Sequence, residues 1–322
     1  MKYSRIVGTG GYLPAKVVTN AELEQTVNTS DAWIRERTGV EQRHIAAPGE
    51  TTCDLAEGAA RAAIAAADWQ PADIDLIVLA TTTPDYVFPS VATQLQDRLG
   101  NYGCPAFDVQ AVCTGFVYAL AIADKFIRTA SARRALVVGA ETFSRILDWT
   151  DRATCILFGD GAGAVVIEAA DEPGIMASHL HADGRYRELL WVPAGVSRGY
   201  DRMRENAAYV EMRGNEVFKM AVRTLGRIVN ETLKANHLGP GDVNWLIPHQ
   251  ANARIIAATA NKLGIPMDHV IMTVAQHGNT SAASVPLALD VGVRDGRIKR
   301  GDIVLLEAFG GGFTWGSVLL KY

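Results

Sequence analysis

The sequence predicts an α/β protein in which helices cover mostly parallel sheets and in which the two halves of the chain are alike. Strand-like apolar runs alternate with helical patterns through residues 1–170, as in a parallel sheet covered on both faces. The same order of segments returns in the second half. The chain has 322 residues, 48% of them hydrophobic, which is enough for two ordinary domain cores or one large core.

The first half can be followed in chain order. After an N-terminal strand, the run Gly8-Thr-Gly-Gly-Tyr-Leu-Pro14 is interpreted as a turn, because Leu13 stands where a dinucleotide-binding motif would have its third glycine. Buried apolar runs predict strands, and apolar or alanine residues at helical spacing predict helices. The predicted strands are 74–80, 107–112, 135–139 and 165–167, and the predicted helices are 54–67 and 116–130.

Three segments of the second half match segments of the first half in their residue types. The matched pairs are Asp242–Pro248 with Asp73–Leu79, Gln276–Ala283 with Gln110–Val117, and Asp302–Gly312 with Ala135–Glu141. The second pairing places Asn279 opposite Cys113. Because two similar halves bring matching loops to one cleft, we expect these loops to meet. We place the boundary in the polar turn Asp171-Glu-Pro-Gly174, which predicts halves at 1–170 and 171–322.

Cys113 lies in the connection between a predicted strand and a predicted helix, in the tight sequence Cys113-Thr-Gly115. Unpaired N–H groups and the positive end of the helix dipole favour an anion at this position. We therefore expect the Cys113 thiolate to form more easily than that of a free thiol, as a nucleophile requires. The alternative is that Cys113 is simply a small core residue.

Composition excludes several classes of function. The formal net charge of −4 argues against general nucleic-acid binding, and no apolar run approaches the length of a membrane span. The N-terminus lacks a signal-peptide pattern, so we expect a cytoplasmic protein. The cysteines have neither metal-ligand spacing nor the density of a disulfide scaffold, so we expect free thiols and no metal. They are Cys53, Cys104, Cys113 and Cys155.

The loops expected beside Cys113 carry His249, Asn279 and the triplet Gly310-Gly-Gly312. A cysteine with a distant histidine is compatible with hydrolysis or with acyl transfer. A histidine and an asparagine that both donate hydrogen bonds can hold the enolate oxygen that forms when a malonyl thioester loses carbon dioxide. The glycines allow backbone to approach a bound thioester and offer N–H groups to an oxyanion, although they equally fit a tight turn.

Four motifs, in this order and in a chain of this length, resemble β-ketoacyl-acyl carrier protein synthase III. They are Ala111-Val-Cys-Thr-Gly115, Pro248-His-Gln-Ala-Asn252, His277-Gly-Asn-Thr-Ser-Ala-Ala283 and Gly310-Gly-Gly-Phe-Thr-Trp-Gly316. The resemblance implies the thiolase fold, a layered αβαβα architecture of two βαβαβαββ-like halves, and a homodimer. It also implies the condensation of a short acyl-CoA with malonyl-acyl carrier protein, which starts type II fatty acid synthesis. Both are substrates, and no cofactor is implied.

The resemblance assigns catalytic roles to the loop residues. Cys113 is acylated with CoA as leaving group, and His249 and Asn279 stabilise the malonyl enolate. The backbone N–H groups of Cys113 and Gly311 hold the tetrahedral oxyanion. Relatives with a second histidine or a cysteine in place of the asparagine carry out elongation or thiolysis, so Asn279 favours the priming reaction.

Other roles follow from the same resemblance. Trp33 and Arg152 sandwich the CoA adenine, a flat ring between an indole and a guanidinium. Further CoA contacts are Arg37, Thr38, Asn215 and Asn252. The acyl pocket is lined by Phe143, Phe158 and Met212 and closed by Phe88 from the partner subunit, which favours a short starter such as acetyl. Without the resemblance, each CoA contact would be interpreted as a solvated side chain.

A positive stripe is predicted for the helix that begins near Gly214, where basic residues recur every four positions. Its members are Lys219, Arg223 and Arg227, and Arg254 and Lys262 lie on the next helix. An acidic acyl carrier protein would dock against such a patch, although an ordinary solvated helix face has the same pattern.

Three rival functions remain open from the sequence. A condensing enzyme of secondary metabolism would keep Cys113, His249 and Asn279 but accept a longer acyl-CoA. A cysteine acyl hydrolase would form the acyl-enzyme and release free acid without consuming malonyl groups. A non-enzymatic scaffold would need an inert thiol, which fits poorly with several motifs that meet at one cleft.

Overall fold

Two separate β-sheets form the framework of this computed structural model, which describes residues 2–201 and 208–322. The first sheet has the strand order β1-β7-β6-β4-β5, and the second has the order β11-β12-β13-β8. The first comprises β1 (Tyr3–Tyr12), β4 (Leu76–Ala80), β5 (Ala106–Val109), β6 (Arg134–Glu141) and β7 (Gly161–Ala170). The second comprises β8 (Ile175–Ala182), β11 (Trp245–Pro248), β12 (Ile303–Gly310) and β13 (Thr314–Lys321).

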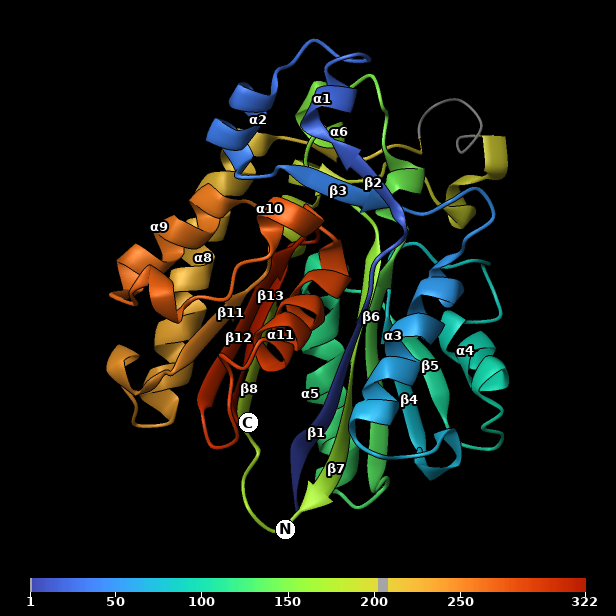
Figure 1. The fold of residues 1–322 in the computed structure, drawn as a ribbon, viewed down its shortest axis with the longest axis vertical. Helices are drawn as coiled ribbons and strands as arrows, with labels where there is room; N and C mark the ends of the chain where they lie inside the picture. The colour runs from blue at the N-terminus through green and yellow to red at the C-terminus, as the bar shows by residue number, and fades with distance from the viewer. Residues whose placement is uncertain (1, 202–207) are drawn as a thin grey trace.

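Helices form three layers around and between these sheets (Figure 1). The central layer contains α5 (Gly115–Arg128) and α11 (Ser284–Arg294), which lie between the sheets. The outer layers contain α3 (Thr52–Ala66) and α4 (Val91–Leu99) on the first sheet, and α8 (Gly214–Ala235) and α9 (Ala253–Leu263) on the second. The layered α/β architecture predicted from the resemblance is thus confirmed.

The central core explains why α5 and α11 are buried on all sides. Leu120 of α5 and Leu289 of α11 pack in one apolar cluster with Val137 of β6 and Leu306 of β12. A helix between two sheets must be apolar around its circumference, and α5 buries nine of its residues, from Gly115 to Ile127. This packing holds the N-terminal ends of both helices at the boundary between the sheets.

Short elements complete the fold around one end of the sheets. The small strands are β2 (Lys16–Thr19) with β3 (Gln42–Ile45), and β9 (Leu190–Trp191) with β10 (Glu211–Met212). The short helices are α1 (Asn20–Leu23), α2 (Asp31–Thr38), α6 (Arg152–Cys155) and α10 (Val274–His277). Figure 1 shows β2, β3, α1, α2 and α6 together above the sheets.

The expectation of mostly parallel sheets is wrong. Parallel pairing is found for β4 with β5 and β6, and for β11 with β12, whereas β7 and β13 are antiparallel to both of their neighbours. A parallel return needs a long crossover, usually a helix, but only three residues separate β12 from β13. The apolar runs of these strands indicate burial on both faces and carry no information on direction.

The two halves repeat, but in a different register from the predicted one. Val112 and Ser281 each begin a 3₁₀ turn with a positive φ, of 49° and 48°, and a central helix follows each turn. The number of residues from Val112 to Ser281 is the same as the number from the start of β6 to the start of β12. In this register Cys113 corresponds to Ala282. The expectation that Asn279 stands opposite Cys113 is therefore wrong, because backbone conformation sets the register and similar polar residues do not.

The boundary between the halves stays a prediction. Every strand of the first sheet ends by Ala170, and the second sheet begins with β8 at Ile175. We propose 1–170 and 171–322 as the two halves on this basis. Within residues 2–201 and 208–322, no helix has the length and apolar character needed to cross a membrane.

Candidate active site

Cys113 lies just beyond the end of β5, in the turn that leads into the central helix α5. Thr314 supports this turn from β13, because its hydroxyl donates to the Ala111 carbonyl at 2.9 Å and its carbonyl accepts from the Thr114 hydroxyl at 3.0 Å. Gly310 of β12 passes so close that a Cβ atom there would lie 2.8 Å from the Cys113 nitrogen. The Cys113 turn therefore depends on a glycine at position 310.

Burial dominates the acidity of Cys113, whose side chain is almost wholly covered. It raises the pKa of the thiol to about 12, and the Glu141 carboxylate acts in the same direction. Hydrogen bonds from Ser281 and from the cysteine's own backbone N–H act against this rise. The expected ease of thiolate formation is wrong for this structure, because the sequence indicates the start of a helix but not the loss of solvation.

His249 follows β11 and is neutral in this environment. Its Nδ1 lies 2.6 Å from the hydroxyl of Ser284, the first residue of α11. Burial lowers the His249 pKa to about 3. Since the Ser284 oxygen also accepts the Gln250 N–H at 3.3 Å, its own proton can point to Nδ1. This arrangement permits the tautomer with its proton on Nε2, where it can be donated to a ligand.

Asn279 is also buried, and its amide has a defined orientation. The Oδ1 atom accepts the backbone N–H of Ser281 at 2.9 Å. The backbone of Asn279 pairs with that of the segment before β7: its N–H donates to Leu157 and its carbonyl accepts from Gly159. With the amide oxygen occupied, the two protons on Nδ2 are available to a ligand.

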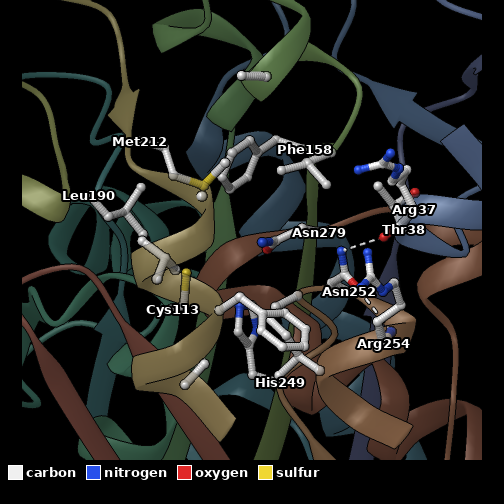
Figure 2. A pocket seen from close by; sticks show the side chains of 18 of the residues that line it. Arg37, Thr38, Cys113, Phe158, Leu190, Met212, His249, Asn252, Arg254 and Asn279 are labelled. Carbon is white, nitrogen blue, oxygen red and sulfur yellow. Dashed lines mark hydrogen bonds between the residues drawn. The ribbon is translucent and has the colours of Figure 1, made fainter. Parts of the chain in front are cut away.

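One cavity of about 300 Å³ brings these residues together. Figure 2 shows the side chains of Cys113, His249 and Asn279 around the same space, beside Met212 and Phe158. We call this space the Cys113 cavity. The three side chains come from three loops that lie far apart in the sequence, and all three loops follow or precede buried strands or central helices.

Five of the six predicted CoA contacts line the same cavity: Trp33, Arg37, Thr38, Asn215 and Asn252. The sixth, Arg152, places its guanidinium 4.6 Å from the centre of the Trp33 ring, and Arg37 lies 5.4 Å from that centre. An aromatic ring could enter between Trp33 and Arg152 only if the two side chains moved apart.

Thr38 and Asn252 already have partners within the protein. The Thr38 hydroxyl donates to the Ile34 carbonyl at 2.7 Å. Asn252 caps α9 by accepting the Arg254 N–H at 2.8 Å, and its Nδ2 donates to the Arg37 carbonyl at 3.1 Å (Figure 2). Both residues therefore shape the wall of the cavity at α2 and α9.

The predicted acyl-pocket residues lie in three different places. Phe158 and Met212 line the Cys113 cavity. Phe143 lines a neighbouring cavity of about 400 Å³ together with Gly311, although its ring stacks on Phe158 with centroids 4.4 Å apart. Phe88 is 83% exposed and lines neither cavity.

Leu190 is a pocket residue that the sequence analysis missed. It lines both cavities and lies in β9, a two-residue strand that directly follows the 3₁₀ helix Gly184–Leu189. Gly311 would bring a Cβ atom within 2.8 Å of the Leu190 carbonyl, so the two backbones are in close contact. No periodic pattern marks a residue of this kind, and only its tertiary position reveals it.

The predicted positive patch is present on the surface. Each of its members is exposed, and within residues 2–201 and 208–322 none of them is in an ion pair: Lys219, Arg223, Arg227, Arg254 and Lys262. The absence of a side chain at Gly226 allows Lys262 to lie across α8, because a Cβ atom there would meet the lysine Cδ at 2.9 Å. Arg254 also lines the Cys113 cavity.

A five-layer α/β fold with a buried cysteine, a neutral histidine and an asparagine around one cavity defines a condensing enzyme of the thiolase fold. Comparison with known proteins shows which family of condensing enzymes the chain belongs to. The models of 3-oxoacyl-[acyl-carrier-protein] synthase III and of its C-terminal part match residues 107–184 and 233–322. The chain belongs to the β-ketoacyl-acyl carrier protein synthase III family, and it is an acyltransferase.

Similar proteins cover the whole chain. The β-ketoacyl-acyl carrier protein synthase III of Thioalkalivibrio sulfidiphilus is 66% identical over all of both chains. The crystal structure of the Aquifex aeolicus synthase III superimposes with a TM-score of 0.93 at 46% identity, covering 99% of this chain and 100% of that one. The priming β-ketosynthase of the R1128 polyketide pathway has a TM-score of 0.94 at 35% identity, covering 99% and 96%.

Proposed function

We propose that the enzyme condenses a short acyl-CoA, acetyl-CoA first among them, with malonyl-acyl carrier protein to give a 3-oxoacyl-acyl carrier protein. Carbon dioxide and CoA are the other products, and the reaction starts type II fatty acid synthesis. One observation carries the proposal: a neutral His249 and an Asn279 amide, both with free protons, line the cavity that contains Cys113.

The first half of the reaction transfers the acyl group to the enzyme. The Cys113 sulfur bonds to the acyl carbonyl carbon, the bond from that carbon to the CoA sulfur breaks, and the thiol proton leaves with CoA. The tetrahedral oxyanion is held by backbone N–H groups of Cys113 and Gly311. The close approach of Gly310 to the Cys113 nitrogen supports this assignment, because it brings the glycine-rich segment beside the nucleophile.

The second half consumes malonyl-acyl carrier protein. Loss of carbon dioxide leaves an enolate whose oxygen accepts hydrogen bonds from His249 Nε2 and Asn279 Nδ2. The enolate carbon then bonds to the acyl carbon, and the Cys113 sulfur leaves. A charged imidazole is unnecessary, because a preorganised neutral donor at a buried position stabilises developing negative charge strongly.

The partners follow from the surface. Acyl carrier protein docks on the positive patch of α8 and α9, which borders the Cys113 cavity through Arg254. A homodimer is supported by three consecutive exposed apolar side chains, Tyr86, Val87 and Phe88, with 60%, 62% and 83% of their surfaces exposed. Phe88 then reaches the acyl pocket of the partner subunit.

The deciding experiment follows acetoacetyl-acyl carrier protein formation from acetyl-CoA and malonyl-acyl carrier protein, together with the intact mass of the enzyme. Product that disappears in C113A supports the proposal. In H249A and N279A, acetylation of Cys113 persists while carbon dioxide release falls about 10²–10³-fold, the usual cost of losing one oxyanion donor. An acetylated enzyme that releases acetate without forming product would establish the hydrolase function instead.

Priming of a polyketide pathway with a longer acyl-CoA is the second candidate, and a priming β-ketosynthase of a polyketide pathway shares the fold at 35% identity. A second cavity of about 400 Å³, lined by Phe143 and Leu190, lies beside the Cys113 cavity, which Leu190 also lines. The same assay with butyryl-CoA and octanoyl-CoA distinguishes the candidates. A higher kcat/KM for either than for acetyl-CoA would favour the longer starter.

A further inference from the structure

Glu141 is a buried carboxylate for which the proposed reaction has no role. It is the last residue of β6 and is wholly inaccessible to solvent. Burial raises its pKa to about 7. Within the part of the chain that the structure describes, no lysine or arginine pairs with it. Burying a carboxyl group without a cation is costly, so its hydrogen bonds must compensate.

Two loops supply those hydrogen bonds. On one side, the Thr82 N–H lies 3.2 and 3.1 Å from the two carboxylate oxygens, and the Thr83 hydroxyl donates at 2.7 Å. On the other side, the Ser281 hydroxyl donates at 3.0 Å. Glu141 thus connects the end of β4 in the first sheet to the turn that precedes α11 in the second half of the chain.

Ser281 contacts both Glu141 and Asn279. Its backbone φ of 48° is in the left-handed region, which a residue with a side chain adopts only when its surroundings hold it there. Its N–H donates to Asn279 Oδ1, and its hydroxyl donates to Glu141. The carboxylate is therefore one of the contacts that hold the turn in this conformation.

The orientation of the Asn279 amide depends on this turn. The two ends of an amide have similar shapes, so only hydrogen bonds decide whether oxygen or nitrogen faces a ligand. With Oδ1 on the Ser281 N–H, Nδ2 is left for the cavity in which Figure 2 shows Asn279. If the turn relaxed, the amide could rotate and present an acceptor to the enolate oxygen, which would repel it.

We propose that Glu141 is a positioning residue for decarboxylation, which holds the Asn279 amide in its donating orientation through Ser281. The inference rests on the proposed role of Asn279 and deepens it. Glu141 touches no reacting atom in this scheme. Its contribution is to support a strained turn from a rigid strand end, so the larger effect of its loss appears in the malonyl half of the reaction.

The test uses E141Q and S281A and measures the two half-reactions separately. Acetylation of Cys113 by acetyl-CoA is followed by intact mass, and carbon dioxide release from malonyl-acyl carrier protein is followed directly. Decarboxylation should fall at least about tenfold more than acetylation does, because small displacements of a catalytic group are costly, whereas acetylation changes only through the direct effects of Ser281 and Glu141 on the Cys113 thiol. E141D, which keeps the charge, should recover part of the loss.

E307Q is the matched control. Like Glu141, Glu307 is a wholly buried glutamate whose pKa is raised by burial. Unlike those of Glu141, its oxygens have no hydrogen-bond partner within residues 2–201 and 208–322. It should keep both half-reactions. S281A carries the test if E141Q does not fold, and retained acetylation shows that each variant is folded.

Two results would overturn the proposal. Decarboxylation at the wild-type rate in both E141Q and S281A would show that the Asn279 amide needs no such support. A loss of acetylation as large as the loss of decarboxylation would show that Glu141 acts on Cys113 instead. It would then act either as a proton acceptor through Ser281 or by supporting the general fold. N279A in the same assay separates these failures from failure of the proposed function, because retained decarboxylation there would remove the role of Asn279 itself.

Discussion

Glu307 offers a measurable link between burial and stability. This residue lies in the middle of β12 and is wholly buried, and within the described residues neither of its side-chain oxygens has a hydrogen-bond partner. Burial raises its pKa from 4.5 to about 8. The folded protein therefore keeps the proton of this carboxyl group at neutral pH, whereas the unfolded chain releases it.

The sign and size of the effect follow from this difference. Because the folded pKa is raised, the stabilising contribution is complete below pH 4.5 and is lost as the pH rises through 8. One pKa unit corresponds to about 1.4 kcal/mol. Between pH 5.5 and pH 8 the wild type should lose about 3 kcal/mol of unfolding free energy through this group, and E307Q should not.

Urea unfolding of the wild type and E307Q at pH 5.5 and pH 8, at one protein concentration, measures this loss. All other titrating groups are shared, so they cancel when the two proteins are compared at each pH. The difference in unfolding free energy should change by about 3 kcal/mol in favour of E307Q on going to pH 8. A difference that is the same at both pH values would refute the reasoning, because the buried carboxyl group would then not be protonated.

Three further predictions concern the site. G310A should slow acetylation of Cys113 at least about tenfold, because the new Cβ atom would lie 2.8 Å from the Cys113 nitrogen; an unchanged rate by intact mass would contradict the proposed packing. Since burial lowers the His249 pKa to about 3, ¹⁵N NMR at pH 5.5 should show a neutral His249 with its proton on Nε2, whereas a charged ring would exclude the proposed donor. R254E should raise the KM for malonyl-acyl carrier protein more than the KM for acetyl-CoA, with an effect that shrinks as salt is added; a salt-independent rise would point to lost packing on Phe218 instead.

Local pattern located several elements of the first half, but the interpretation of Gly8–Pro14 as a turn is wrong because β1 continues to Tyr12, the strand predicted over 107–112 ends at Val109, and α4 was missed. The predicted strand 135–139 lies within β6 (Arg134–Glu141), and the predicted helix 116–130 corresponds to α5 (Gly115–Arg128). Apolar spacing reports how a segment is buried, and segments this strongly apolar have few alternatives. The position of Cys113 between strand and helix follows from the same pattern.

Features that depend on long-range contacts could not be predicted from apolar spacing. The antiparallel pairing of β7 and β13, the register that matches Cys113 with Ala282, and the part played by Leu190 all depend on contacts between distant segments. The interpretation of the repeat relied on similar polar residues in Gln276–Ala283 and Gln110–Val117. The positive φ of Ser281, which sets the register, leaves no mark in a serine.

The sequence by itself determined the alternation of strands and helices through local periodicity, and it contains the distinctive runs around Cys113, His249 and Asn279, whose resemblance to a known family implied that family and the layered architecture. Only the tertiary structure decided their electrostatic state and orientation. Burial makes His249 neutral and the Cys113 thiol a weak acid, and the Glu141–Ser281 contact lies beside the Asn279 amide. Solvation and hydrogen-bond geometry arise from groups that meet only when the chain is folded, so no stretch of sequence contains them.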